Sequence, residues 1–471
     1  MIILGAVVYY GSLNGQFVLD DYYNIKYNGY IQNWPYLPAL FLTDIGANVA
    51  GATYSMYRPV QMLTYMLDHS LWKLNPVGYH LTNIILHILA ALTICWLVNL
   101  LFNDRILSLL TASLFVVHPI HTEAVCYLSG RADPLALIFM MLTFIFYIKQ
   151  KTSDSDLLYT LMIASYSLAL LSREGSFIVL ALLVLYDYTF KGKPSLKGLL
   201  SLAGVTVLYF ILKTTISGSL VHGFYGTVLP QRIQGAFVAL ASYVRLLLLP
   251  FNLHMEYGAQ PGPFCGGAVL AGSVLLLSLV TLAVLARKNN KLVFFSISWF
   301  LITLVPVSNI YPINAYMAEH WLYMPSVGFF LILAGLINSL LRDKRVFILG
   351  AAMLAALMLF YSHLTIEQNK YWKDPIKFYK RTLLYSPKNP VLLTNLGFEY
   401  IDKGMYDEAI SLYKKIVAAE PDNARAYNNL AVAYYQKKQY DMAIKYCDEA
   451  VKLGYEVKPG FLKDLEPFRN K

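Results

Sequence analysis

The sequence has few charged residues and few cysteines. Asp, Glu, Lys and Arg make up 14% of its 471 residues and 57% are hydrophobic, whereas soluble proteins carry roughly a quarter charged residues. This shortage excludes an ordinary soluble enzyme and indicates a membrane protein. The four cysteines lie too far apart in the sequence for a metal-binding motif, and we interpret them as packing residues: Cys95, Cys126, Cys265 and Cys447.

The sequence also has no dense basic stripe with interleaved aromatic residues, which argues against nucleic-acid binding as the reason for its net charge of +10. The Lys and Arg residues instead gather in short loops between apolar runs and in a polar segment at the C-terminal end. Basic short loops are typical of the cytoplasmic side of membrane proteins. The change in composition predicts two domains, a membrane domain over 1–365 and a soluble domain over 366–471.

Long apolar runs predict the spans of the membrane domain, because a spanning helix needs about 20 apolar residues. The candidates are Thr82–Phe102, Ile106–Val117, Pro134–Ile148, Leu157–Leu171, Phe177–Phe190, Gly198–Ile216, Gly235–Leu249, Gly267–Leu285, Leu292–Pro306, Leu322–Leu341 and Val346–His363. The segment Met1–Leu13 is apolar but short, and without a basic flank it does not resemble a signal peptide. We interpret it as the second half of a first span whose start lies upstream.

The basic loops set the orientation of these spans. With every basic loop inside, the alternation holds only if Gly235–Leu249 lies at the interface instead of crossing. We therefore predict about eleven crossings, a cytoplasmic N-terminus and a C-terminal domain outside. Almost every unusual polar residue then falls in the outer loops 15–80, 118–133, 173–176, 217–232 and 308–321. The first of these loops is expected to contain interfacial helices. This asymmetry favours an enzyme acting on a membrane-anchored substrate over a transporter, whose charges lie nearer the bilayer centre.

The C-terminal domain contains a repeat of 34 residues, the period of tetratricopeptide (TPR) repeats. The first repeat is Pro390–Asn423 and the second is Ala424–Val457. The segment Trp372–Tyr385 is interpreted as the last helix of a degenerate preceding repeat, and Lys458–Phe468 as a capping helix. Such an array is expected to bind an extended peptide or a partner protein, and the alternative is a structural cap.

The first outer motif is Phe17–Ile25, which contains the adjacent carboxylates Asp20 and Asp21. Two neighbouring carboxylates repel each other, so the pKa of one is expected to rise, and such a group can act as a general base toward a hydroxyl. The alternative is that Asp20 caps a helix. Further along, Arg58 precedes the amphipathic stretch Met62–Leu74. Its guanidinium is expected either to bind a lipid phosphate or to anchor this helix.

Two histidines and a glutamate, His118, His121 and Glu123, share the second outer loop. Their spacing matches no usual zinc pattern, so we predict no metal site and assign them to substrate binding. The last outer motif contains Glu319 and His320 at the start of a later span. Its polar side chains are expected to line the same cavity.

Two pairs of charged residues that lie close together in the sequence complete the candidate site. Arg131 and Asp133 lie at the mouth of a span, where they are expected to form an ion pair that positions a ligand or serves the structure alone. Arg suits phosphate because its planar guanidinium donates two hydrogen bonds at once. Arg173 and Glu174 interrupt two apolar spans at the outer face, where a cationic side chain at a helix start can hold a phosphate.

These motifs, in this order and ahead of a TPR domain, resemble the transmembrane and TPR-repeat-containing O-mannosyltransferase (TMTC) family of the C-type glycosyltransferase superfamily. The resemblance rests on five pieces of sequence: Phe17–Ile25, Tyr57–Pro59, Asn75–His80, His118–Asp133 and Glu319–Gly328. It implies the C-type glycosyltransferase fold. It also implies transfer of a sugar, mannose by default, from a polyprenyl-phosphate carrier with inversion on the non-cytoplasmic face.

The resemblance also implies roles for single residues. Asp20 matches the acidic residue that deprotonates the acceptor hydroxyl, and Asp21 matches a second acidic position that orients the acceptor or Asp20. Arg173 stands where the family usually has Lys and would face the leaving phosphate. His320 stands where the family commonly has Arg, which puts a phosphate role there in doubt. Arg131 and Asp133 match a pair of residues in the family's second outer loop.

Several alternatives stay open. The acceptor is expected to be a protein Ser or Thr hydroxyl, and the alternatives are a lipid-linked glycan or envelope polymer, or a non-enzymatic TPR membrane scaffold. No cofactor is firmly implied, and a divalent cation held by Asp20 or Asp21 is a further alternative. The compact loops fit a bacterial or archaeal member, so the expected location is the plasma membrane, or the endoplasmic reticulum if the source is eukaryotic.

Overall fold

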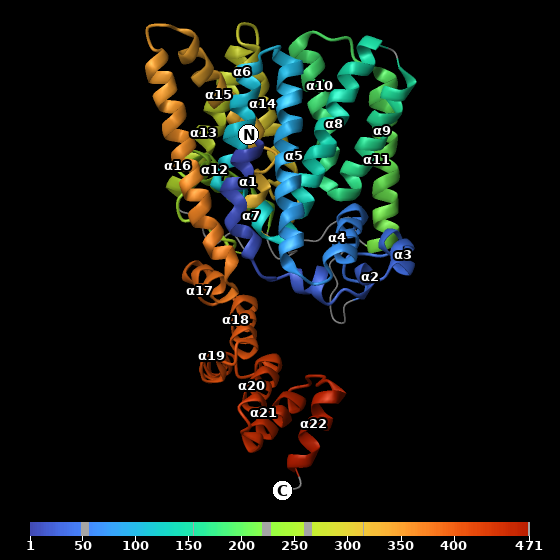
Figure 1. Ribbon diagram of the computed structural model, residues 1–471, viewed down its shortest axis with the longest axis vertical. Helices are drawn as coiled ribbons and strands as arrows, with labels where there is room; N and C mark the ends of the chain where they lie inside the picture. The colour runs from blue at the N-terminus through green and yellow to red at the C-terminus, as the bar shows by residue number, and fades with distance from the viewer. Residues whose placement is uncertain (49–55, 154, 219–227, 259–265, 314, 470–471) are drawn as a thin grey trace. The chain divides into compact units, whose positions relative to one another are not determined.

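The computed structural model describes residues 1–48, 56–153, 155–218, 228–258, 266–313 and 315–469 (Figure 1). Within these ranges every regular element is helical, so the all-α prediction is confirmed. The chain forms two compact units, Met1–Lys373 and Asp374–Lys471. Three cysteines, Cys95, Cys126 and Cys447, carry free thiols, and Cys265 lies outside the described residues.

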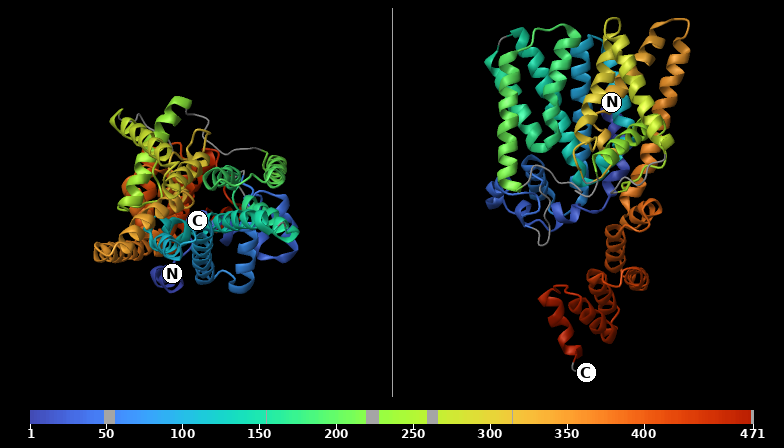
Figure 2. Two further views of the ribbon diagram at one scale, coloured as in Figure 1. Left: turned by 90° about the horizontal axis from the view of Figure 1, so that it is seen from above. Right: turned by 180° about the vertical axis from the view of Figure 1, so that it is seen from behind.

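Unit 1 is a bundle of upright helices (Figures 1 and 2). Its main helices are α1 (Ile2–Tyr9), α5 (Pro76–Phe102), α6 (Arg105–Val117), α8 (Ala132–Ser153), α9 (Asp156–Ser172), α10 (Val179–Phe190), α11 (Leu196–Ser217), α12 (Leu229–Leu248), α13 (Gly266–Ala286), α14 (Lys291–Leu304), α15 (Ser326–Arg342) and α16 (Phe347–Lys373). Their apolar composition follows the runs in the sequence, and their lipid-facing sides keep large hydrophobic residues exposed, as on α13 and α16.

Five described helices are long and apolar enough to cross a membrane: α5, α8 with the preceding turn, α11, α13 and α16. A sixth span results if α6 is joined to the short helices after it across a 57° bend. Shorter apolar helices cover Ile2–Asn14, Asp156–Ser172, Lys291–Val307 and Ser326–Arg342. The finding supports a membrane protein, and the count of about eleven crossings stays a prediction.

The first outer loop folds into short helices at one end of the bundle (Figures 1 and 2). They are the π-helix η2 (Tyr22–Lys26), α2 (Gly29–Gln32), η3 (Trp34–Tyr36), α3 (Leu37–Leu42) and α4 (Pro59–Trp72). The short helix η1 (Tyr10–Asn14) connects α1 to this loop. Pro59 opens α4, where its missing N–H costs nothing. Buried side chains such as Ile25, Tyr65 and Leu128 join this loop to the second outer loop in one hydrophobic cluster.

The second outer loop lies at the same end of the bundle. It contains η4 (Pro119–His121), α7 (Thr122–Cys126) and η5 (Leu128–Arg131). Pro119 ends α6, because the residue before a proline is disfavoured in helical conformation. Gly130 lets η5 fold back onto α7, since a Cβ there would lie 2.8 Å from the Glu123 carbonyl oxygen.

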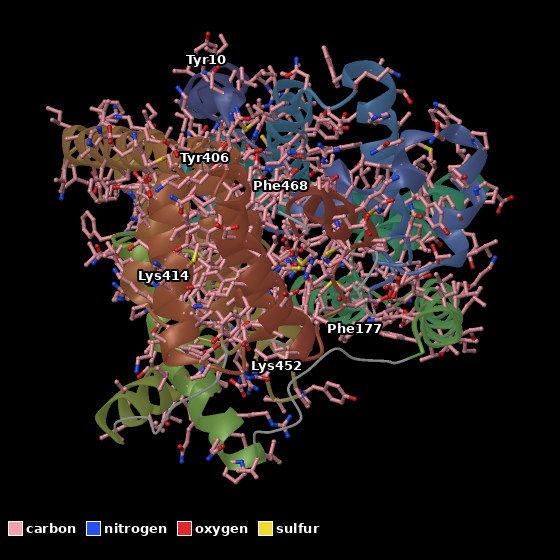
Figure 3. All side chains as sticks on the ribbon, turned by 90° about the horizontal axis from the view of Figure 1, so that it is seen from below. Tyr10, Phe177, Tyr406, Lys414, Lys452 and Phe468 are labelled. Atoms are coloured by element: carbon pink, nitrogen blue, oxygen red, sulfur yellow. The ribbon has the colours of Figure 1, made fainter. Side chains whose placement is uncertain are left out.

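Unit 2 consists of six helices: α17 (Pro375–Tyr385), α18 (Pro390–Asp402), α19 (Tyr406–Ala419), α20 (Ala424–Gln436), α21 (Tyr440–Lys452) and α22 (Pro459–Arg469). Pairing of α18 with α19 and of α20 with α21 reproduces the two predicted repeats. Gly397 allows the close approach of the first pair, because a Cβ there would lie 2.4 Å from the Tyr413 ring. Phe468, labelled in Figure 3, stacks on Tyr440 and closes the end of the array.

One boundary differs from the sequence prediction. The helix α16 continues past the predicted end of the membrane domain at residue 365. Trp372 therefore belongs to the last turn of α16 and not to the degenerate repeat helix. The side chain of Asp374 accepts hydrogen bonds from the backbone N–H groups of Ile376 (3.0 Å) and Lys377 (3.2 Å), so it begins α17. The helix continues because Thr365, Asn369 and Trp372 remain buried against unit 1 after the polar composition begins.

Candidate active site

The acid pair lies on an unusual stretch of backbone. Leu19 has a φ of +49°, a conformation that a leucine rarely adopts, and the π-helix η2 follows Asp21 directly. Strained residues and π-helical turns both occur preferentially at functional sites. The two carboxylates on this stretch have different environments.

Asp21 is completely buried. Its carboxylate accepts three hydrogen bonds, from the Val18 N–H (3.1 Å), the Ser129 N–H (2.8 Å) and the Ser129 hydroxyl (2.7 Å). Burial raises the pKa of the Asp21 carboxyl to about 7, although these hydrogen bonds oppose the rise. The carboxylate is occupied by the protein itself, so Asp21 joins the first outer loop to the second and orients its neighbour.

Asp20 is half-buried, unlike Asp21. Its backbone N–H donates to the Tyr127 hydroxyl at 3.2 Å. Burial raises the pKa of the Asp20 carboxyl, while a hydrogen bond from Tyr127 and the charge of Arg58 oppose the rise. A carboxylate with a raised pKa and partial exposure is a suitable general base.

Arg58 lies near this carboxylate at the start of α4. Its Nε and Nη2 atoms donate to the two carboxylate oxygens of Glu174 at 3.2 and 3.0 Å, which makes a bidentate pair between α4 and η6 (Glu174–Ile178). The Arg58 side chain keeps 15% of its surface exposed. Although burial raises the pKa of the Glu174 carboxyl, the cations Arg58 and Lys213 hold it well below its usual range.

Arg173 is a second partly exposed cation. It forms an ion pair with Asp133 at the start of α8 and keeps 11% of its side chain exposed. Burial and the nearby charge of Arg58 lower the pKa of the Arg173 guanidinium to about 10, so it is positively charged at neutral pH. Two cations with part of their surface open therefore lie on the side of the site that contains Asp20 and Glu174.

The predicted ion pair between Arg131 and Asp133 is wrong. The Arg131 side chain is fully buried and pairs with Asp68 of α4 at 2.6 Å. Its remaining N–H groups donate to the Asn83 side chain at 2.6 Å, the Tyr79 carbonyl at 3.0 Å and the Thr64 hydroxyl at 3.2 Å. Asp68 could not be paired from sequence because it lies 63 residues away. With its donors directed at protein atoms, Arg131 holds α4, α5 and η5 together.

The two loop histidines are also buried. His118 contacts the Leu247 carbonyl through Nε2 at 3.1 Å and accepts from the Ile120 N–H at 3.2 Å. His121 packs among aromatic rings, with its centroid 4.2 Å from that of Phe115. Among the residues that the structure describes, no three His, Cys, Asp or Glu side chains come together as metal ligands. Both histidines serve packing in this structure and not an open site.

A second polar network joins the later loops. The carboxylate of Glu123 accepts from the His320 backbone N–H at 2.9 Å and contacts Nδ1 of the same residue at 2.7 Å. Glu319 accepts from the His254 N–H and the Tyr257 hydroxyl, both at 2.6 Å. Glu319 and Glu123 are buried, whereas the His320 side chain keeps 26% of its surface exposed. The Glu123 contacts hold η8 (Glu319–Leu322) against α7, and the Glu319 contacts hold it against the segment that follows α12.

Sequence reasoning missed several residues that build this site. Tyr127 and Ser129, which hold the acid pair, lie inside the predicted outer loop 118–133, and their hydroxyl groups were the available signal. Asp68 carried a different signal, an acidic residue within an otherwise apolar helix face. Tyr257 and Asn83 gave no local signal, because their partners are distant in the sequence.

The fold therefore defines a class: an all-α protein with apolar, membrane-type helices that ends in a tetratricopeptide array. The family model for the tetratricopeptide repeat matches residues 394–454. Among curated proteins, the chain is 26% identical to protein O-mannosyl-transferase F38B6.6 of Caenorhabditis elegans, over 87% of this chain and 60% of that protein. It is 26% identical to human protein O-mannosyl-transferase TMTC3 (87% and 50%) and 27% identical to human TMTC1 (86% and 53%).

The predicted resemblance to the TMTC O-mannosyltransferases is thus confirmed, and the chain spans between half and three-fifths of the length of these relatives. Two solved structures are also similar. The ArnT structure from Cupriavidus metallidurans bound to undecaprenyl phosphate has a TM-score of 0.43 and 15% identity, with 96% of this chain and 76% of that chain covered. The oligosaccharyltransferase AglB from Archaeoglobus fulgidus has a TM-score of 0.45 and 13% identity, with 86% and 58% covered.

Proposed function

We propose that the chain is an integral membrane glycosyltransferase that moves mannose from a polyprenyl-phosphate carrier to a Ser or Thr hydroxyl of a protein. The proposal rests on the difference between the environments of the two carboxylates in the acid pair. Asp21 is occupied by three protein donors, whereas Asp20 is half-buried and has a raised pKa. The curated relatives, which are named as protein O-mannosyl-transferases, support the choice of reaction.

In this reaction the acceptor oxygen attacks the anomeric carbon of the sugar. Asp20 takes the proton of the acceptor hydroxyl as the new C–O bond forms. The bond between the anomeric carbon and the carrier phosphate breaks on the opposite side, and the phosphate leaves with the electron pair. A single displacement of this kind inverts the anomeric configuration.

The leaving phosphate gains negative charge, and we assign its stabilisation to Arg58 and Arg173. Both cations are partly exposed, and each is oriented by a carboxylate, Glu174 for Arg58 and Asp133 for Arg173. Donors fixed in advance of the reaction stabilise developing charge without a cost of reorganisation. Because these side chains supply positive charge, we expect transfer to continue after chelation of divalent cations.

The arrangement of loops supports a site on the non-cytoplasmic face. The first and second outer loops lie at one end of the bundle (Figure 1). The end of α8, with Lys149 and Lys151, and the connection from α10 to α11, with Lys191 and Lys193, lie at the other end. Lysines near the ends of spanning helices favour the cytoplasmic side. A membrane-anchored donor would then meet Asp20 outside the cytoplasm, where we also place the repeat domain.

The test uses purified protein in liposomes with labelled polyprenyl-phosphate mannose and a pool of Ser- and Thr-containing peptides. We expect transfer by the wild type and a rate lower by about 100- to 10,000-fold for Asp20→Asn, the range for loss of a general acid or base. Asp156→Asn, an exposed carboxylate at the start of α9, is the matched control. Equal rates for Asp20→Asn and the wild type would refute the assignment of the base.

The same experiment separates the alternative functions. Label that enters a lipid-linked glycan, and not the peptides, would keep Asp20 as the base but change the acceptor. Absence of transfer to any hydroxyl acceptor would leave a membrane scaffold as the better account. A reporter fused after Lys471 tests the orientation, since it should be active only outside the cytoplasm.

A further inference from the structure

We propose that Tyr127 is a positioning residue for Asp20 and that Trp372, from the last turn of α16, holds Tyr127 in place. The inference rests on the proposed function, because it concerns the general base of that reaction. It assigns a role to an aromatic pair that lies between the acid pair and the end of the membrane unit.

The turn at Tyr127–Ser129 supports both carboxylates of the acid pair. The Tyr127 hydroxyl accepts from the backbone N–H of Asp20 at 3.2 Å. Two residues further on, Ser129 donates to Asp21 through its N–H at 2.8 Å and its hydroxyl at 2.7 Å. One short turn thus sets the backbone of Asp20 and the side chain of Asp21.

The backbone of this turn is itself fixed by α4 and α5. The Tyr65 hydroxyl donates to the Leu128 carbonyl at 2.8 Å, and the Gln61 side chain donates to the Ser129 carbonyl at 2.9 Å. The Asn83 side chain donates to the Val125 carbonyl at 3.1 Å. Because the backbone cannot shift easily, the orientation of the Tyr127 side chain is what remains to be set.

Trp372 sets that orientation. Its ring stacks on the Tyr127 ring at a centroid distance of 5.8 Å and an interplanar angle of 23°, and both side chains are buried. A stacked aromatic pair of this kind contributes about 0.5–1.5 kcal/mol beyond the area that it buries. The Tyr127 ring is thereby kept in one plane, with its hydroxyl directed at Asp20.

The position of Trp372 follows from the docking of α16 on the second outer loop. Thr365 donates to the Val117 carbonyl at 2.6 Å. One turn later, the Asn369 side chain accepts from the Cys126 thiol at 3.1 Å. Spacings of four and three residues place Thr365, Asn369 and Trp372 on one helix face. The last turn of α16 therefore contacts Tyr127, and Tyr127 in turn contacts the proposed base, Asp20.

The hydroxyl also affects the ionisation of Asp20. Tyr127 donates to the Asp20 carboxylate and opposes the rise in its pKa that burial causes. Without this hydroxyl the pKa of Asp20 should rise further. The acidic limb of the pH–kcat profile should therefore move to higher pH, because the base is protonated over a wider range.

The test compares Tyr127→Phe, Trp372→Ala and Trp372→Phe with the wild type in the liposome assay. For Tyr127→Phe we expect kcat to fall by about 10- to 100-fold, as for a displaced catalytic group, with KM for the donor nearly unchanged and the acidic limb at higher pH. Trp372→Ala should also lower kcat and move the acidic limb to higher pH, in both cases by less than Tyr127→Phe does. Trp372→Phe should restore both, since it keeps a stacked ring.

The control is Tyr10→Phe, because the Tyr10 side chain is 69% exposed and points away from the bundle (Figure 3). A readout independent of transfer is the pH dependence of carbodiimide modification at Asp20, followed by peptide mass spectrometry, since the reagent needs the protonated carboxyl. Tyr127→Phe should move its midpoint to higher pH.

Three outcomes would overturn the inference: an unchanged kcat in Tyr127→Phe, a lower kcat with an unmoved acidic limb, or an unmoved modification midpoint. Failure of the proposed function has a different signature, namely full transfer by Asp20→Asn or none by the wild type. In that case the modification midpoint still decides whether Tyr127 controls Asp20.

Discussion

The arginines at the end of the bundle that contains the acid pair fall into two regions that the sequence does not distinguish. Arg131 lies between α4, α5 and η5, fully buried against Asp68. Arg58 and Arg173 lie between α4, η6 and α8, with Glu174 and Asp133 as partners, and both stay partly exposed. All three have a carboxylate partner, so the difference lies in burial and in the number of protein acceptors that surround each guanidinium.

This difference separates structural from functional use of the same side chain. A buried ion pair is costly to break, because removing one partner leaves an uncompensated charge in a medium of low polarity. A partly exposed pair can exchange part of its contacts for a ligand phosphate, which offers the same bidentate geometry. The contrast predicts that variants in the two regions fail in different ways.

The largest effect is expected for Arg131→Ala. The free energy of unfolding should fall by about 3–5 kcal/mol, because Asp68 is left buried without its cation. The measurement is the thermal unfolding midpoint in detergent. Arg342→Ala is the control, since this side chain is 62% exposed and pairs with Asp104 at 2.6 Å; about 0–1 kcal/mol is expected there. A wild-type midpoint in Arg131→Ala would abolish the distinction between the two regions.

The next largest effect is expected for Arg173→Gln, in catalysis more than in stability. Loss of this positive charge should lower the transfer rate by about 100- to 1,000-fold, the range for removal of one donor to developing charge. Asp133 is buried and loses its cation, but the amide can still donate to it, so the unfolding midpoint should fall less than in Arg131→Ala. Arg173→Lys should retain most of the activity. A loss of stability as large as that of Arg131→Ala would place Arg173 in the structural region.

Arg58→Lys should have a smaller effect, of about tenfold. Lysine keeps the charge but cannot make the two parallel hydrogen bonds to Glu174, so the cation is held less firmly. Steady-state kinetics with the labelled donor should show this change mainly in KM for the donor. An unchanged KM, with donor binding intact, would remove Arg58 from the phosphate site and leave it as an anchor of α4.

Asp21 is expected to make the stability of the fold depend on pH. Burial raises its pKa from the usual 3.8 to about 7 in the folded protein. The stability that this carboxyl contributes is therefore fully present below about pH 4 and is lost as the pH rises through about 7. The unfolding midpoint should fall between pH 5 and pH 8, and Asp21→Asn should flatten that fall. A midpoint that rises over this range would contradict the assignment.

Much of the fold could be predicted from local sequence. The 34-residue period predicts the paired helices from Pro390 to Lys452, since each repeat places the same small and large residues at the same positions. The end of α16 could not be predicted in this way. The composition turns polar near residue 366, but one face of the helix continues to be buried as far as Trp372.

The candidate site was predicted in part. The acid pair and the partly exposed cations Arg58 and Arg173 were identified from charged residues in otherwise apolar surroundings. The predicted pairing of Arg131 with Asp133 was wrong, because it rested on their closeness in the sequence. In the fold Arg131 pairs with Asp68, and Asp133 pairs with Arg173. His118 and His121, which were assigned to substrate binding, are buried among aromatic rings.

The sequence by itself determined the apolar runs, the repeat period and the inventory of chemical groups at one end of the bundle, because these depend on neighbours within a few turns of the chain. Only the tertiary structure decided which arginine is buried, which carboxylate of the acid pair is occupied, and that α16 reaches Tyr127. These features depend on contacts between residues far apart in the sequence, such as Asp20 with Tyr127 and Tyr127 with Trp372. Burial in such contacts, more than residue type, separates the proposed base and phosphate-binding residues from the framework around them.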